Sequence, residues 1–183
     1  MTKDIITVIY YFRIKDTSVL VKHLEMGTNN VLAQEEIING KVDQEYQTSK
    51  SEDVSSKYEL VEIPSNANGN MTEEQIVVIY YYQLKDSRVI VKYVDKSTNE
   101  ELYDSKIING KVDSNYQTEA QPIENYTCVE NSNNTSGVMT EDEITVIYYY
   151  LKNTNVTVQY IDKITNQKIS TDTVIRGVIG DDY

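Results

Sequence analysis

The chain has 183 residues, a formal net charge of −12 and a single cysteine. This length suits one ordinary domain or two small ones, and the charge disfavours nucleic acid and anionic membrane surfaces as partners. Sixteen tyrosines beside one phenylalanine and no tryptophan favour strands that are apolar at the ring and hydrated at the hydroxyl. We therefore expect a β-rich protein whose charge keeps it soluble and monomeric.

Internal repeats organise the sequence. The segment Ile37 to Asp43 recurs unchanged at Ile107 to Asp113, and a looser copy lies at Ile175 to Asp181. The tyrosine-rich segment Met71 to Tyr82 matches Met139 to Tyr150, and Met1 to Phe12 is a third version of it. Three copies of one unit are therefore represented.

The copies predict the domain boundaries. Residues 1–15 would be the C-terminal strand of a preceding repeat, and residues 153–183 the truncated N-terminal part of a further one. Complete repeats are expected at 16–85 and 86–152, and units of about 70 residues can fold autonomously. We expect the truncated copy to be the least stable part and to borrow a strand edge from a neighbouring molecule.

The elements of the second complete repeat can be predicted in chain order. Residues 88–95 form a strand by their β-branched and aromatic content, and residues 96–99 form the turn that ends it. Further strands are expected at 105–112 and 126–130. Only residues 115–124 could hold a helix, which would be short because no 3.6-residue apolar period is sustained. The expected class is therefore β-rich α+β.

The last strand, residues 144–150, is apolar on both faces, which predicts a central position in the sheet. Tyr148 and Tyr150 are expected to face the core. Phe12 stands where Tyr82 and Tyr150 stand in the other copies, so the tyrosine hydroxyl is predicted to be dispensable there. Cys128 replaces Leu60 of the first repeat and is expected to be a small core residue.

The order of motifs resembles the MucBP (mucin-binding protein) repeat of Gram-positive surface proteins. The residues that carry the resemblance are Val89 to Asp95, Gly110 to Val112, Tyr116 to Thr118, Tyr126, Gly137 and Thr145 to Tyr150. It implies tandem ubiquitin-like β-grasp repeats that form an elongated rod. It also implies an extracellular protein that is anchored to the cell wall through parts outside these residues and binds mucin or other host glycoproteins.

Two departures from the family pattern fall in turns. Asp43 and Asp113 replace the second glycine of a Gly-x-x-Gly motif, and Glu124-Asn125 precedes Tyr126 where the family has Pro-Gly. Only the last copy, Gly177 to Gly180, keeps both glycines. These changes affect loop geometry rather than chemistry.

No residue pattern indicates an enzyme. The only histidine, His23, occupies the strand position that Tyr93 and Tyr160 hold in the other copies, which indicates a strand residue rather than a catalytic one. No phosphate-binding glycine loop, Cys/His metal spacing or cofactor motif is found. Calcium remains an option at Asp95 or Asp162, and an intramolecular Lys–Asn isopeptide bond is not excluded by the sequence.

The candidate ligand-contact residues are Tyr81, Tyr149, Asn133 and Asn134. Tyrosine rings on the second face of the last strand could stack on sugar rings, or they could be covered by the helix or a neighbouring strand. The two asparagines lie in a polar loop after the third strand. Two hypotheses follow: an adhesin repeat with weak, multivalent binding to host glycoproteins, or a structural spacer without a ligand. No stretch approaches the roughly 18 apolar residues of a membrane span, and no export or sorting signal is present, so such signals would lie outside these residues.

Overall fold

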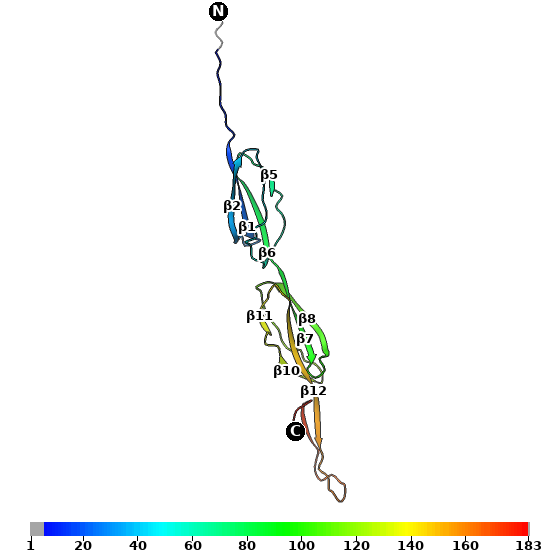
Figure 1. Ribbon diagram of the computed structural model, residues 1–183. Helices are drawn as coiled ribbons and strands as arrows, with labels where there is room; N and C mark the ends of the chain where they lie inside the picture. Colours follow the sequence, from blue (N-terminus) through cyan, green and yellow to red (C-terminus); the bar gives the residue numbers. More distant parts are fainter. Residues whose placement is uncertain (1–5, 183) are drawn as a thin grey trace, which may run out of the picture. The chain divides into compact units, whose positions relative to one another are not determined.

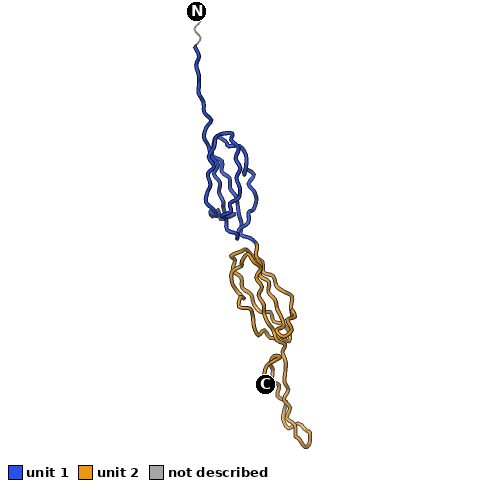
Figure 2. Tube along the Cα trace, in the orientation of Figure 1, with its two compact units in different colours: residues 1–85 blue, residues 86–183 orange. Residues whose placement is uncertain are grey.

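The computed structural model describes residues 6–182, all of whose regular elements are strands (Figure 1). Within these residues no helix is long and apolar enough to cross a membrane. The chain divides into two compact units, residues 1–85 and residues 86–183 (Figure 2). Each unit has a hydrophobic core of its own.

The first unit contains a four-stranded sheet and a two-stranded ribbon. The sheet has the order β2-β1-β6-β4, with β1 and β6 parallel and the outer pairs antiparallel. The ribbon pairs β3 with β5. The strands are β1 (Asp16–Glu25), β2 (Val31–Lys41), β3 (Glu45–Gln47), β4 (Tyr58–Leu60), β5 (Asn68–Asn70) and β6 (Ile76–Leu84).

The second unit repeats this topology and adds one strand. Its sheet has the order β10-β12-β7-β8, β9 pairs with β11, and β13 pairs with the later part of β12. The predicted strands are confirmed, as is the central position of the tyrosine-rich last strand. The strands are β7 (Asp86–Asp95), β8 (Glu101–Lys111), β9 (Asn115–Gln117), β10 (Tyr126–Asn131), β11 (Ser136–Val138), β12 (Ile144–Val158) and β13 (Thr173–Val178).

The core of each repeat lies between the parallel central strands and the ribbon. In the second repeat, alternate residues of β7 meet alternate residues of β12, with Val91 opposite Val146 and Tyr93 opposite Tyr148. These four side chains are buried, and full burial of an aliphatic side chain contributes roughly 1.5–3 kcal/mol. Cys128 packs against this core at the position of Leu60 in the first repeat, as predicted.

The expected short helix within residues 115–124 is absent, so the α+β assignment is wrong and the described chain is all-β. Residues 115–117 form β9 instead. The ring of Tyr116 is buried in the core, and its hydroxyl donates a hydrogen bond to the backbone oxygen of Asn134 (3.0 Å). Burial of this ring on a ribbon therefore prevailed over local helix formation.

The segment after β9 is kept extended by a proline and by a tyrosine hydroxyl. Pro122 disfavours helical geometry at Gln121, the residue that precedes it. The hydroxyl of Tyr150 donates to the backbone oxygen of Gln121 (2.7 Å). Tyr82 uses its hydroxyl as well, with the ring nitrogen Nδ1 of His23 at 3.0 Å. The hydroxyl that Phe12 lacks thus has a hydrogen-bond partner in both complete repeats, and its being dispensable stays a prediction.

The departures from the family's glycine pattern fall at left-handed backbone positions. Asp43 and Asp113 have φ angles of 67° and 68°, and Gly180, at the equivalent position of the last copy, has 95°. Asn125, which stands in place of the glycine before the third strand, has 64°. Aspartate and asparagine tolerate this region better than other non-glycine residues, so the turns keep their geometry without glycine.

Separate folding of the two complete repeats is our first prediction. Residues 16–85 and 86–152 each contain a four-stranded sheet, a ribbon and a core, so each fragment should unfold cooperatively on heating or in urea. Circular dichroism of the two fragments tests this. Failure of both to fold would show that the boundaries are misplaced.

His23 makes the first repeat chemically different from the second. It lies in β1 as predicted, is 3% exposed, and stacks on the ring of Tyr80 at 5.3 Å between centroids. Burial lowers the pKa of His23, and the negative charge of Glu36 opposes this effect in part. The second repeat has Tyr93 at this place, stacked on Tyr148 at 6.0 Å.

Acid should therefore weaken the first repeat specifically. Because the pKa of His23 is lower in the folded state, the unfolded chain binds more protons, and stability is lost as pH falls below the unfolded value of about 6.5. Urea unfolding of residues 16–85 across this range should show the loss. With His23→Tyr, the stability of residues 16–85 should depend on pH more nearly as the stability of residues 86–152 does. An unchanged pH dependence in this variant would contradict the assignment.

Candidate functional site

The face of each sheet that points away from its core carries the same pattern of side chains in both repeats. We call these surfaces the outer faces. Their residues alternate along the strands with buried core residues and therefore point to the opposite side. The outer face of the first repeat comprises Leu20, Lys22, Ile37, Val77, Ile79 and Tyr81, and that of the second comprises Ile90, Lys92, Ile107, Thr145, Ile147 and Tyr149.

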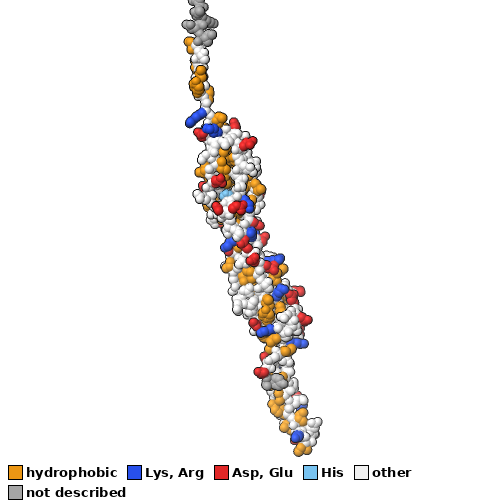
Figure 3. Space-filling model, viewed as in Figure 1, with side chains coloured by type: hydrophobic (Ala, Val, Ile, Leu, Met, Phe, Trp, Pro, Cys, Tyr) orange, Lys and Arg blue, Asp and Glu red, His pale blue; other side chains and the backbone are white. Residues whose placement is uncertain are grey.

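The outer faces are partly apolar and open to solvent. Ile37 and Ile107 are 58% and 55% exposed, and the central isoleucines of β6 and β12 are half-buried. Figure 3 shows hydrophobic side chains interleaved with charged ones on the visible surface of both units. Ion pairs flank the apolar residues, with Lys22 2.8 Å from Glu35 and Lys92 3.1 Å from Glu101.

Tyr81 and Tyr149 lie at equivalent points of the outer faces. Tyr81 in β6 is opposite Leu24 of β1, and Tyr149 in β12 is opposite Val94 of β7. Both tyrosines are half-buried. The helix that we expected as a possible cover is absent, and each tyrosine keeps part of its surface accessible beside its neighbouring strands. A tyrosine ring offers an apolar face and a hydroxyl, the combination that suits a sugar ring.

Asn133 and Asn134 lie in the loop between β10 and β11, and they differ in environment. Asn133 is exposed, whereas Asn134 is half-buried and donates its side-chain amide to the backbone oxygen of Thr145 (3.0 Å). Thr145 and Tyr149 are four residues apart on one strand, about 13 Å. The structure therefore does not bring Asn134 and Tyr149 into one compact site.

A structural role of Asn134 was missed by sequence reasoning. Where β12 extends past its pairing with β10, side chains bond its free backbone groups. Ser132 Oγ accepts a hydrogen bond from the amide of Ile147 (2.9 Å), and Asn134 donates to the backbone oxygen of Thr145. Asn66 does the same in the first repeat, donating to the backbone oxygen of Val77 (3.0 Å). The recurrence of asparagine at this loop position in both repeats was the available signal.

The acidic residues considered for calcium cap their own turns. Asp95 accepts hydrogen bonds from the hydroxyl and amide of Ser97, which lower its pKa. Asp162 accepts the amides of Thr165 and Ile164, both at 2.8 Å, and these also lower its pKa. In the part of the chain that the structure describes, no group of three or more His, Cys, Asp or Glu side chains is placed to hold a metal ion.

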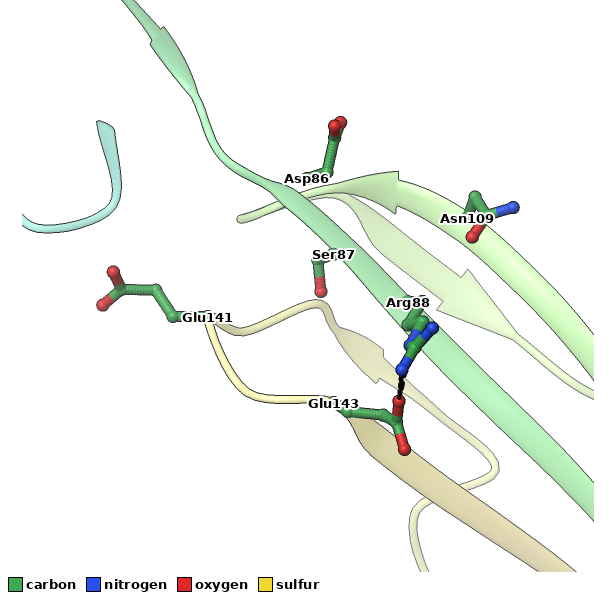
Figure 4. Close-up of a pocket in the computed structure, with 6 residues that line it drawn as sticks. All are labelled: Asp86, Ser87, Arg88, Asn109, Glu141 and Glu143. Carbon is green, nitrogen blue, oxygen red and sulfur yellow. Dashed lines mark hydrogen bonds and ion pairs between the residues drawn. The ribbon is translucent and has the colours of Figure 1, made fainter. Parts of the chain in front are cut away.

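An open hollow of about 250 Å³ lies where β7 begins. Figure 4 shows Arg88 and Glu143 directed toward one another as an ion pair, while Asp86 and Glu141 point away from it. The first repeat has a neutral equivalent, in which Gln75 donates to Ser18 (2.8 Å). The hollow is acidic on balance, so it does not suit an anionic glycan. Because both repeats have a side-chain contact here, the residues at this position stabilise the pairing of the first and last strands where that pairing begins.

The MucBP domain model matches residues 18–83, 88–151 and 155–183. The chain is 34% identical over 178 residues to internalin J of Listeria monocytogenes serovar 1/2a, covering 93% of this chain and 20% of that protein. It is 30% identical over 177 residues to internalin I of Listeria monocytogenes serotype 4b, covering 93% of this chain and 10% of that protein. The chain thus spans a fifth or less of these relatives.

Two solved structures share limited similarity. A crystal structure of Mub-RV has a TM-score of 0.31 and 14% identity, covering 72% of this chain and 97% of that one. Domains 3–4 of the Streptococcal High Identity Repeats in Tandem from a cell surface protein have a TM-score of 0.36 and 8% identity, covering 74% and 96%. At these scores neither structure defines the fold, and the assignment depends on the sequence matches. These matches extend over three successive segments, and the chain therefore belongs to the MucBP domain family.

Proposed function

We propose that this chain is a repeat segment of an extracellular bacterial surface protein, and that it binds mucin or other host glycoproteins weakly and repeatedly through its outer faces. The proposal rests on one observation: both complete repeats have a half-buried tyrosine, Tyr81 or Tyr149, among aliphatic side chains at equivalent positions. Family membership and the internalin relatives support a surface location. Anchoring to the cell wall would be provided by other parts of the parent protein.

We also propose that each repeat is a β-grasp variant. Its first and last strands are parallel neighbours at the centre of a mixed sheet, as the family resemblance implies. The two-stranded ribbon would occupy the place of the helix over the core. The end-to-end rod stays a prediction.

A structural spacer is the second candidate function. It is favoured by β12, which runs for 15 residues from the second repeat into the following partial copy without an intervening loop. A continuous strand limits bending between successive copies, because its backbone remains hydrogen-bonded to β7 before the junction and to β13 after it. Both functions can belong to the same protein, but only the first requires a ligand.

Binding should depend strongly on the number of repeats. One outer face offers little buried area, so a single repeat should bind with a Kd on the order of 0.1 mM or weaker, and linked repeats should gain about 100-fold or more through effective concentration. Titration of mucin against residues 86–152, residues 16–152 and longer arrays measures this. Equal affinity at every repeat number would contradict multivalent binding. Absence of binding at every repeat number would contradict the adhesin function and favour the spacer function.

Salt gives this titration an internal control. The chain carries a net charge of −12, and sialylated or sulfated mucins are also negative, so screening should strengthen binding as salt rises. An unrelated acidic β domain in the same buffers reports non-specific adsorption.

The tyrosines of the outer faces should carry the contact. Tyr81→Ala together with Tyr149→Ala in residues 16–152 should weaken binding by about three- to tenfold per repeat if each ring stacks on a sugar. Phenylalanine at both positions should retain most of the binding, because the ring face is kept. Glycan titration with a urea melt of each variant separates lost contact from lost stability.

A matched control is available in the same sheet. Tyr103 in β8 is 54% exposed but contacts the core residue Tyr93 edge-on at 5.9 Å, and so belongs to the other side. Tyr103→Ala should leave binding unchanged. Equal losses for Tyr103→Ala and Tyr149→Ala would sink the assignment to the outer face.

A further inference from the structure

The chain enters and leaves each complete repeat on neighbouring strands at the centre of its sheet. In the first repeat it enters at Asp16, where β1 begins, and leaves at Leu84, where β6 ends. Because the two strands are parallel, these two points lie at opposite ends of the pair. β7 and β12 have the same arrangement in the second repeat. Tension along the chain therefore acts on the central strand pair of each repeat.

This tension acts parallel to the strands. It draws the first strand backward along its own axis and the last strand forward, so the two strands can part only by sliding past each other. The hydrogen bonds of a parallel pair are evenly spaced along it, and all of them share the load. In a hairpin that is pulled at its open end, the load falls instead on one pair at a time. Sliding therefore requires a larger force than opening for the same number of bonds.

The central pairs of the two repeats have the same length. Residues 19–25 pair with residues 76–82, and residues 89–95 pair with residues 144–150, which gives seven pairs in each repeat. In both, the residue after the first strand donates one more backbone hydrogen bond to the last tyrosine of the pairing, at 2.7 Å and 2.8 Å. The loop from the ribbon to the edge strand, by contrast, is two residues longer in the first repeat.

Side chains oppose sliding as well. In the first repeat Gln75 donates to Ser18 (2.8 Å) where the pairing begins. Val21 and Val78, which are opposite each other within it, are fully buried. Side chains alternate between the two faces of a strand, so a slip of one residue would set core side chains level with outer-face residues of the partner strand. The packed core thus holds the two strands in register.

We infer that each complete repeat is a load-bearing module, whose parallel central strands resist tension along the chain because they can part only by sliding. Lys85 alone separates β6 from β7, so tension passes from the first central pair to the second through a single residue. This role goes beyond the proposed function, since it requires no glycan ligand. It adds to a spacer the ability to stay folded while the chain is pulled.

Pulling the same folded repeat in two directions tests the inference. The full chain carries Cys128→Leu, which copies Leu60 of the first repeat, and is held through Asp16→Cys with either Lys85→Cys or Lys41→Cys. The first combination makes β1 slide against β6. The second opens the hairpin of β1 and β2, because residues 16 and 41 are opposite each other. Both variants lose the same ion pair between Asp16 and Lys41, and urea unfolding checks that their stabilities match.

The hairpin is a matched control, because β1 has eight pairs with β2 and seven with β6. At one pulling speed, the force that unfolds the repeat should be about twofold higher or more in the sliding direction. Forced unfolding reports the unfolding rate rather than the free energy of unfolding, so variants of equal stability can differ in this way.

The length released on unfolding identifies the event. A complete repeat held at residues 16 and 85 should lengthen by about 200 Å, because an extended chain spans roughly 3.4 Å per residue and the folded ends are about 35 Å apart. The unmodified chain, pulled through its two ends, should show two steps of about this size. Equal forces in the two directions, or a lower force for sliding, would overturn the inference. Extension of the unmodified chain without the two steps would overturn it as well.

Discussion

Each complete repeat depends on the contact between its first and last strands. β1 and β6, like β7 and β12, are parallel, and parallel neighbours cannot be joined by a tight turn, so the intervening chain must cross over the sheet. In many proteins that crossover is a helix. Here it is made of a hairpin partner, a short ribbon and an edge strand. The ribbon covers one side of the sheet, and the other side remains as the outer face.

The ribbon explains why several of the core aromatic residues are tyrosines rather than phenylalanines. A ribbon of two three-residue strands with its loops is a thin cover, so rings that start on the sheet reach the loop backbone above the core. The hydroxyls of Tyr80 and Tyr148 meet Thr48 and Thr118, at 2.8 and 2.9 Å. Burial raises the pKa of Tyr150 from its ordinary value of 10 to about 12, so its hydroxyl remains a hydrogen-bond donor even in alkaline solution. Phenylalanine would fill the same space but remove these hydrogen bonds, including the one that the backbone oxygen of Gln121 accepts from Tyr150.

The sequence predicted the structure best where the residues of a single strand are enough to indicate its place in the sheet. The doubly apolar pattern of residues 144–150 correctly predicted a central strand with Tyr148 and Tyr150 in the core. Sequence-based prediction failed where a contact with a residue far away in the chain determines the local structure. Residues 115–124 gave no local sign that Tyr116 would reach Asn134. The close approach of Gly110 to Met139, where an added Cβ would lie 2.5 Å from the sulfur, was likewise not predictable from either residue alone. Asn134 was therefore named for ligand contact, whereas its amide is used to cover a strand edge.

The outer face has to be judged against the needs of the sheet itself. A central strand favours β-branched and aromatic residues on both faces, so Ile79 and Ile147 need no ligand to explain them. The tyrosines are different, because Tyr81 and Tyr149 lie near the end of the parallel pairing and are not opposite another aromatic ring. Scattered apolar residues are ordinary on a protein surface, but a patch that returns at the same place in successive repeats is not scattered. If a surface ligand was selected, its contact therefore centres on these two rings rather than on the aliphatic residues beside them.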